Sequence, residues 1–493
     1  MNERYGNVIG GREDFEGEEA RIRSPIDGSP VATVVLANAD KTNEAIDAAA
    51  EAFRKWSLTT VHERQGLLLK LAERVQSRAE EYTLLEVRNT GKTIRQCTFF
   101  DISLGIDHIK YFASTKEFQP ERVIEHPEYP GTRGFIQNAP MGVVGAIAPW
   151  NLPFVMAVWK VMPALLTGNT VVLKPSHFTP LTALELSNDI KAAGFPSGVV
   201  NTLAGRGDEV GQSLATSPKV NMISFTGSTA TGEKLVSSAR GVKKFTLELG
   251  GKSPNIVFED ADLDNAAKGV LFGIYLHSGQ LCESGSRLIV QDSIKEEFLK
   301  KLKDRMERMR AGNPLEMDTD IAAITTDKQK TKIETMVQAG IGQGARLYYQ
   351  KEISGMVPKG GLYYAPTLLT DVAKHSQLAK EEVFGPVLVA VGFENEDDAV
   401  GIANDTDYGL AAGVWSGSID RAKKVAGRIE AGTVWVNDYH LVSAAAPRGG
   451  FKKSGVGREL GLEGIMEFTQ TRHIFVNEGG DIEEVAYGLV LPE

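Results

Sequence analysis

Apolar residues recur with two alternating periods through the middle of the chain. Short apolar runs rich in β-branched residues alternate with segments whose apolar positions fall three or four residues apart, the spacings of strands and helices. Strands are predicted at 143–148, 170–173, 199–203 and 222–225, with helices between them at 153–167, 180–193 and 207–216. This alternation is typical of a parallel, doubly wound sheet, which binds ligands beyond the carboxyl ends of its strands.

Related patterns flank this region. A second α/β series starts near residue 250, with helices predicted at 263–276 and 293–311 and strands at 288–290, 388–391 and 433–437. Nearer the N-terminus, strands are predicted within 20–36, a helix after Asp40, and a further helical region at 61–89 that Gly91 stops. Residues 121–140 carry Pro and Gly between β-like runs and predict a hairpin that leaves the first domain, and 472–477 is strand-like.

Composition excludes several classes of protein. The net charge of -10 disfavours nucleic acid as a partner. There is no apolar run long enough to span a membrane and no basic, then apolar, signal-peptide start. Two cysteines are too few for a disulfide framework, so we expect a cytoplasmic protein with free thiols and no membrane partner. The eight histidines show no metal-ligand spacing, so no metal is predicted.

Two side chains are candidates for chemistry. Cys282 has glycines and small residues on both sides, which would let a substrate approach its sulfur, although an isolated cysteine is more often structural. Cys97 is interpreted as such a structural cysteine. Glu248 lies between two leucines, and two glycines follow. If its surroundings are apolar, they raise the pKa of its carboxyl and make it a candidate general base. The alternative is an ordinary exposed glutamate.

Several motifs together resemble the aldehyde dehydrogenase superfamily. The pair LELGGKSPNIV (247–257) and GQLCESGSR (279–287) is similar to its two signature motifs. Other matching segments occur in the same order, namely APWNLPF (148–154), LKPS (173–176), FTGSTATG (225–232), EEVFGPV (381–387), WVN (435–437) and PRGGFKKSGVGRELG (447–461). The resemblance covers nearly the whole chain.

The resemblance implies the aldehyde dehydrogenase α/β fold and an assembly. A Rossmann-like cofactor domain is expected at 1–120 and 141–249, and an α/β catalytic domain at 250–470. A β oligomerisation arm is expected at 121–140 and 471–493, adding strands to a partner's sheet in a homodimer or homotetramer.

The resemblance also implies a hydrolytic, NAD(P)-dependent oxidation of an aldehyde. Cys282 would attack the aldehyde carbonyl, while the Asn151 amide and the Cys282 backbone N–H stabilise the oxyanion. Loss of hydride gives a thioester, which water activated by Glu248 would hydrolyse. Glu248 argues against a CoA-acylating enzyme, and the cofactor motifs argue against a simple esterase or cysteine hydrolase.

For the cofactor, the usual G-x-G-x-x-G fingerprint is absent from the first strand–turn–helix, and Gly205-x-Gly207 imitates it only loosely. The family instead places the pyrophosphate at the turn that here runs from Gly227 to Gly232 and opens a helix. The full set implied for NAD or NADP is Trp150, Lys174, Ser176, His177, Gly205, Gly227, Ser228, Gly232, Leu249, Gly250, Glu382 and Phe384.

Three positions depart from the commonest family pattern. His177 stands where NAD-preferring relatives often carry a glutamate, so NADP use alongside NAD is expected unless His177 points to solvent. Glu283 follows the nucleophile, where a carboxylate would disfavour thiolate. Arg448 replaces an aromatic residue; it either pairs with Glu283, the favoured reading, or binds a substrate carboxylate.

The substrate tunnel is expected to be roomy and mostly apolar. Its implied residues are Leu152, Val155, Trp159, Leu276, Glu283, His440, Val442 and Arg448. Such a tunnel favours medium or long apolar aldehydes, retinal-like ones included. A semialdehyde held through Arg448 is an alternative, and so is betaine aldehyde, which the lack of an evident aromatic box makes less favoured.

Overall fold

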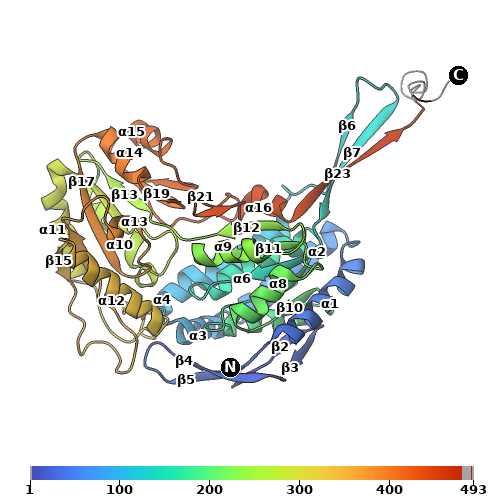
Figure 1. Ribbon diagram of the computed structural model, residues 1–493, viewed down its shortest axis with the longest axis horizontal. Helices are drawn as coiled ribbons and strands as arrows, with labels where there is room; N and C mark the ends of the chain where they lie inside the picture. Colours follow the sequence, from blue (N-terminus) through green and yellow to red (C-terminus); the bar gives the residue numbers. More distant parts are fainter. Residues whose placement is uncertain (1–2, 480–489, 491–493) are drawn as a thin grey trace.

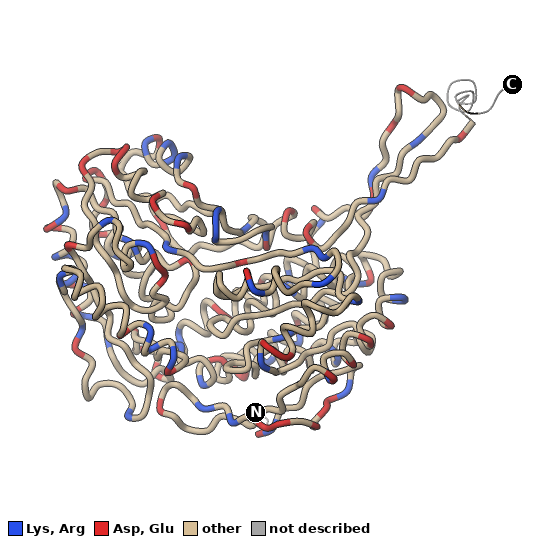
Figure 2. Tube along the Cα trace, in the orientation of Figure 1, with Lys and Arg blue, Asp and Glu red and all other residues tan. Residues whose placement is uncertain are grey.

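The computed structural model describes residues 3–479 and 490. Two lobes, each built on a sheet, form the body, and a narrow arm projects from it (Figure 1). Acidic and basic residues are intermixed along most of the trace (Figure 2). No helix of the described residues is long and apolar enough to cross a membrane.

The first lobe contains an eight-stranded sheet. Its order is β22 (Gly455–Val456), β12 (Lys244–Glu248), β11 (Met222–Thr226), β8 (Val143–Ile147), β9 (Thr170–Lys174), β10 (Val200–Thr202), β2 (Asn7–Ile9) and β3 (Arg12–Asp14). The five strands from β12 to β10 are parallel, which confirms the doubly wound sheet that the apolar runs predict. β22 joins the sheet antiparallel from far along the chain, because Gly455 and Val456 pair with Glu248 and Leu247.

The strand order creates a place for a ligand. The chain runs from β8 outward through β9 to β10 and then returns to β11 on the other side of β8. Neighbouring strands whose connections leave in opposite directions open a crevice at their carboxyl ends. The segments after β8, β9, β11 and β12 therefore meet there, which brings the turns that follow Ile147, Lys174 and Thr226 close to Glu248.

Helices cover both faces of this sheet. They are α1 (Ala39–Trp56), α2 (Val61–Ser77), α3 (Ala79–Thr90), α4 (Ile94–Gln96), the π-helix η1 (Cys97–Ile102), α5 (Ser103–Ser114), α6 (Pro153–Leu166), α7 (Leu181–Ala192), the π-helix η2 (Gly207–Gly211), α8 (Gln212–Thr216) and α9 (Thr229–Ser238). Every residue of α6 is buried. A helix apolar on all sides belongs in a core, and α6 packs against α2, α5 and α7.

The helical region predicted at 61–89 is two helices. Arg78 leaves helical geometry between α2 and α3, with φ -112° and ψ 15°. Its guanidinium bonds to Asp189 and Glu185 of α7, so a tertiary contact that periodicity cannot show accompanies the break. Gly91 ends α3 in the left-handed conformation, as predicted.

The second lobe contains a seven-stranded sheet. Its order is β15 (Arg346–Gln350), β16 (Thr367–Thr370), β17 (Val387–Phe393), β14 (Arg287–Gln291), β13 (Pro254–Val257), β19 (Ala411–Trp415) and β20 (Thr433–Val436), with all but β15 parallel. Its helices are α10 (Leu263–Tyr275), the 3-10 turns η3 (Leu276–Gly279) and η4 (Asp292–Ile294), α11 (Lys295–Met306), α12 (Asp327–Gly342), α13 (Gln377–Lys380), α14 (Glu396–Asn404) and α15 (Ile419–Ala426).

The arm is a three-stranded antiparallel sheet. β7 (Thr132–Pro140) lies between β6 (Glu121–Glu125) and β23 (Thr469–Asn477), so the hairpin predicted at 121–140 is present and a distant strand joins it. α16 (Gly461–Glu467) leads into β23. Residues 480–489 and 491–493 of the expected arm lie outside the described residues. The remaining strands form small ribbons, β1 (Arg4–Tyr5), β5 (Pro30–Leu36) and β4 (Glu18–Arg23) in one and β18 (Tyr408–Gly409) with β21 (Phe451–Lys452) in another.

Candidate active site

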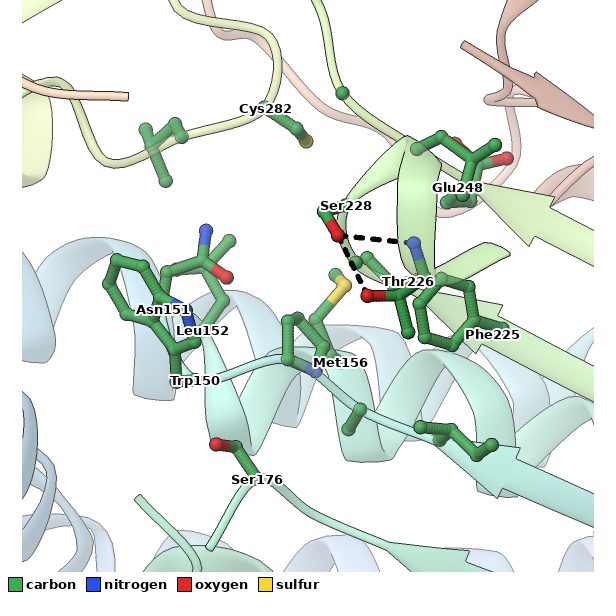
Figure 3. A pocket seen from close by; sticks show the side chains of 18 of the residues that line it. Trp150, Asn151, Leu152, Met156, Ser176, Phe225, Thr226, Ser228, Glu248 and Cys282 are labelled. Atoms are coloured by element: carbon green, nitrogen blue, oxygen red, sulfur yellow. Dashed lines mark hydrogen bonds between the residues drawn. The ribbon is translucent and has the colours of Figure 1, made fainter. Parts of the chain in front are cut away.

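A cavity of about 400 Å³ lies at the carboxyl ends of the first sheet and reaches the second lobe. Cys282, Asn151 and Glu248 all line it, although they come from separate segments of the chain. Figure 3 shows the Cys282 side chain directed into this cavity, between Asn151 on one side and Glu248 on the other.

The loop that carries Cys282 is held by close backbone contacts. A Cβ on Gly251 would lie 2.4 Å from the Cys282 carbonyl oxygen, so only glycine allows the two loops to meet here. Cys282 is partly exposed to the cavity, whereas Cys97 is fully buried, as its structural interpretation expects. Burial raises the pKa of Cys282 to about 11, while Arg448 beside it lowers that pKa.

Asn151 stands just before α6 and is buried. Its side-chain nitrogen donates to the backbone oxygen of Gln280 at 2.8 Å, which ties the amide to the cysteine loop. An amide NH₂ has two N–H donors, so the second remains for a group in the cavity. The amide is thus anchored in a position from which it can donate to an oxygen bonded to a carbon on Cys282.

Glu248 is the last residue of β12 and is buried. Burial, and secondarily the carboxylate of Glu459, raise the pKa of Glu248 well above its usual range. A carboxyl of raised pKa in a cavity can act as a general base near neutrality. Of the two interpretations of Glu248, the structure therefore agrees with the buried glutamate and not with the exposed one.

Lys160 and Glu459 extend this acid–base group and were missed in the sequence. Lys160 Nζ lies 2.6 Å from Glu459 Oε1 and 3.3 Å from Ser224 Oγ, with both charged side chains fully or almost fully buried. Glu459 also lines the cavity, and its Oε2 has no hydrogen-bond partner among the described residues. Their signals were present, a lysine inside the apolar helix α6 and a glutamate inside the matching segment GRELG, but only the fold brings them together.

One end of the cavity is cationic. Lys174, Ser176, His177, Gly227 and Ser228 line it after β9 and β11. Burial lowers the pKa of Lys174 to about 8, and its Nζ bonds to the Pro175 carbonyl. Burial, then Lys174 and Arg206, lower the pKa of His177. Ser228 caps α9 by accepting from the Thr231 backbone N–H (Figure 3).

A carboxylate and two aromatic rings also line the cavity. Glu382 Oε1 accepts from the Gly251 backbone N–H at 3.1 Å, and a Cβ on Gly250 would lie 2.8 Å from Glu382 Oε2. The rings of Trp150 and Phe384 meet edge to face with centroids 5.3 Å apart. Lys174 as donor, Glu382 as acceptor and two aromatic walls fit the ribose and ring groups of a nicotinamide dinucleotide.

Arg448 pairs with Glu283, as the favoured interpretation of these two unusual residues expects. His440 Nδ1 lies 2.8 Å from the other oxygen of the Glu283 carboxylate. Arg448 and Glu283 line the cavity, while His440 is buried behind them.

Most of the implied site residues line the cavity, and four do not: Gly205, Gly232, Leu276 and His440. Packing requires glycine at both positions, because a Cβ on Gly205 would lie 2.4 Å from Val210 Cγ2 and one on Gly232 would lie 2.7 Å from Leu249 Cδ2. Leu276 is buried in η3. Further wall residues that the sequence did not single out are Phe100, Leu104, Met156, Phe225, Leu281, Gln329 and Lys332.

Known proteins are similar to this chain over nearly its full length. The aldehyde dehydrogenase family model matches residues 13–474. A betaine aldehyde dehydrogenase of Bacillus subtilis (strain 168) is 40% identical over 474 residues, 94% of this chain and 96% of that protein.

Solved structures agree with the sequence comparison. A betaine aldehyde dehydrogenase from Staphylococcus aureus, in complex with NAD⁺, has a TM-score of 0.94 at 36% identity and covers 98% of this chain and 96% of its own. An NAD-dependent aldehyde dehydrogenase from Sinorhizobium meliloti has a TM-score of 0.93 at 40% identity, with 97% and 95% covered. The chain therefore belongs to the aldehyde dehydrogenase family, and its fold is the fold of that family.

Proposed function

We propose that the protein oxidises an aldehyde to a carboxylic acid through a covalent intermediate on Cys282, with NAD or NADP as hydride acceptor. The observation that carries this proposal is the convergence of Cys282, Asn151 and Glu248 on one cavity that also holds dinucleotide-type donors and acceptors. A nucleophile, an oxyanion donor and a base are the three groups that acyl transfer to water requires.

In the first step the sulfur of Cys282 attacks the aldehyde carbon, and the carbonyl oxygen becomes an oxyanion. The free N–H of the Asn151 amide, anchored through Gln280, donates to that oxygen. A nicotinamide cofactor, when bound, would accept the hydride from the substrate carbon that is bonded to Cys282, and loss of this hydride converts the adduct into a thioester.

Glu248 then removes a proton from the water that attacks the thioester. Its raised pKa makes it a stronger base than a solvent-exposed glutamate. Glu459 is the charged neighbour that raises this pKa, and Lys160 offsets part of that effect.

The cofactor end supports use of both NAD and NADP. His177 carries no charge that would repel a 2′-phosphate, and Lys174 and Arg206 lie close enough to lower its pKa. The favourable charge therefore comes from Lys174 and Arg206 rather than from a protonated His177. A ratio of kcat/KM that favours NAD by more than about a hundredfold, about 2.7 kcal/mol, would contradict dual use.

The substrate end favours an uncharged, apolar aldehyde. Its walls include Phe100, Leu104, Leu152, Val155, Met156, Trp159 and Val442. An aromatic ring can attract a quaternary ammonium, but the guanidinium of Arg448 already lies over the Trp159 ring, with its Cζ 5.5 Å from the ring centroid. A cationic aldehyde would meet that positive charge.

Betaine aldehyde is the second candidate because relatives of 40% and 36% identity carry that name. A semialdehyde is favoured less, because Glu283 already offsets the charge of Arg448, the group that would attract its carboxylate.

The test is a panel of uncharged, carboxylate-bearing and quaternary-ammonium aldehydes assayed with NAD and NADP by absorbance of the reduced cofactor. We expect turnover that Cys282→Ala abolishes and that Cys97→Ala, the matched cysteine control, retains. Medium or long apolar aldehydes should give the highest kcat/KM. A higher kcat/KM for betaine aldehyde would overturn the apolar assignment, and activity in Cys282→Ala would overturn the mechanism.

A further inference from the structure

The guanidinium of Arg448 is fixed in place by contacts on several sides. It pairs with Glu283 and lies over the Trp159 ring. The backbone of Arg448 exchanges two hydrogen bonds of 2.7 Å with Glu459. A long side chain held at both its backbone and its charged end loses little further entropy when it acts on a neighbour.

Glu283 is itself held from both sides. Its Oε1 lies 2.8 Å from His440 Nδ1, and the other ring nitrogen of His440 lies 3.1 Å from the Gly273 carbonyl oxygen. The Tyr439 hydroxyl donates to the Glu283 backbone oxygen at 2.8 Å. The carboxylate is therefore a rigid support for Arg448 rather than a free charge in the cavity.

The supported guanidinium lies on the wall of the cavity that Cys282 also lines, and its partner Glu283 is the next residue after Cys282. Its positive charge lowers the pKa of the Cys282 thiol. Burial and the carboxylates of Glu248 and Glu382 act in the opposite direction. A guanidinium has five N–H donors, so pairing with Glu283 leaves donors for the sulfur.

We propose that Arg448 is a catalytic residue whose guanidinium stabilises the thiolate of Cys282, both before attack on the aldehyde and when the thioester is cleaved. The inference rests on the proposed role of Cys282 as nucleophile. In this proposal the Glu283 carboxylate holds the Arg448 guanidinium in place, and the guanidinium stabilises the negative charge on the buried sulfur.

The experiment measures the pH dependence of iodoacetamide alkylation at Cys282, followed by mass spectrometry on the full-length protein without aldehyde or cofactor. The decisive variant is Arg448→Met with Glu283→Leu, because it removes the pair together and leaves no unpaired buried carboxylate. We expect its apparent thiol pKa to rise by about one unit or more, so that alkylation at pH 8 slows about tenfold. Arg448→Met alone should raise it further, since Glu283 is then uncompensated.

Two more variants complete the test. Arg448→Lys keeps a positive charge and should retain most of the wild-type alkylation rate. Arg421→Met is the matched control, because Arg421 also pairs with a carboxylate, Asp260, and lies over a ring, Phe258, but acts elsewhere; it should leave the alkylation profile unchanged. An unchanged profile in the double variant, with thermal unfolding showing a folded protein, would overturn the proposal. Because alkylation needs no turnover, this outcome is distinct from failure of the proposed oxidation.

Discussion

Burial sets the acid–base properties of the side chains proposed to be catalytic. It is the largest cause of the raised pKa of both Cys282 and Glu248, so each is held in its neutral form more strongly than in water. Nearby charges then adjust the two groups in different directions. Arg448 favours the thiolate of Cys282, whereas Glu459 keeps a proton on Glu248.

Replacing Glu459 tests this balance at Glu248. Glu459→Gln removes the carboxylate that raises the pKa of Glu248, so that pKa should fall. Because a base works only when deprotonated, hydrolysis of the acyl-enzyme should persist to lower pH than in the wild type. Single-turnover deacylation rates measured across pH check this, with the exposed Glu463→Gln on the same segment as control. A shift of the profile to higher pH would contradict the assignment.

Asn151 gives a second prediction for a single residue. Asn151→Ala removes the amide that is anchored to Gln280 and aimed at the cavity. We expect kcat/KM to fall about a hundredfold to a thousandfold, the usual effect of losing one oxyanion donor. The alkylation rate of Cys282 by iodoacetamide should stay near the wild-type value. A parallel loss of alkylation would mean that Asn151 shapes the loop instead.

At the candidate site, the segment after β12 approaches the Cys282 loop closely at a glycine. Gly251 follows β12 and lies against the Cys282 loop, so a side chain there would push apart the two segments that carry the proposed base and the proposed nucleophile. Gly66, in the exposed interior of α2, has open space around it. The same substitution should therefore have opposite effects at these two positions.

Gly251→Ala should lower activity and stability, because its Cβ would overlap the Cys282 carbonyl oxygen. Gly66→Ala should raise the free energy of unfolding by about 0.5–1 kcal/mol, the gain in helix propensity, with activity unchanged. Denaturant unfolding and steady-state rates check both. Wild-type activity in Gly251→Ala would show that the two loops do not need this close approach.

The sequence predicted most helices and strands, but it did not predict where tertiary contacts break a helix or add a distant strand to a sheet. Periodicity locates the strands β8, β9 and β11 because fully buried parallel strands are continuous apolar runs. It joins α2 and α3 into one region because the break at Arg78 accompanies ion pairs to α7. It also gives no sign that β22 returns to the first sheet.

For the candidate site too, the sequence identified residues in motifs but not the contacts that depend on the tertiary fold. Motif resemblance selects Cys282, Glu248 and Asn151 as catalytic candidates, and the structure brings all three to one cavity. The resemblance also implies a cofactor role for Gly205 and Gly232, but it does not show that packing against Val210 and Leu249 requires glycine at both positions. Packing partners are set by the tertiary fold, and no local pattern in the chain reports them.

In the whole molecule, the three-stranded arm is the part that extends beyond the two lobes. It projects away from both lobes (Figure 1), and its flanking strands β6 and β23 carry exposed apolar residues, Val123, Ile474 and Phe475. Exposed strand edges with apolar side chains pair readily with another chain. We infer that the arm joins copies of this protein into a homodimer or homotetramer.

Sedimentation velocity tests this assembly. The wild-type protein should sediment as an oligomer, and Ile474→Lys should shift it toward the monomer because a charge enters the apolar arm surface. Ile419→Lys, at an isoleucine on α15 that is also exposed, is the control and should leave the oligomer intact. A monomeric wild type, or an unchanged oligomer in Ile474→Lys, would contradict the role of the arm.

The burst of reduced cofactor in Glu248→Gln separates formation of the acyl-enzyme from its hydrolysis. If Cys282 forms the acyl-enzyme and Glu248 is needed only for its hydrolysis, rapid mixing with aldehyde and NAD should give close to one reduced cofactor per site, followed by near-complete arrest. Mass spectrometry should then find the acyl group on Cys282. Sustained turnover at the wild-type rate, or an arrested enzyme that carries no acyl group on Cys282, would contradict a covalent mechanism on Cys282 with Glu248 as the base.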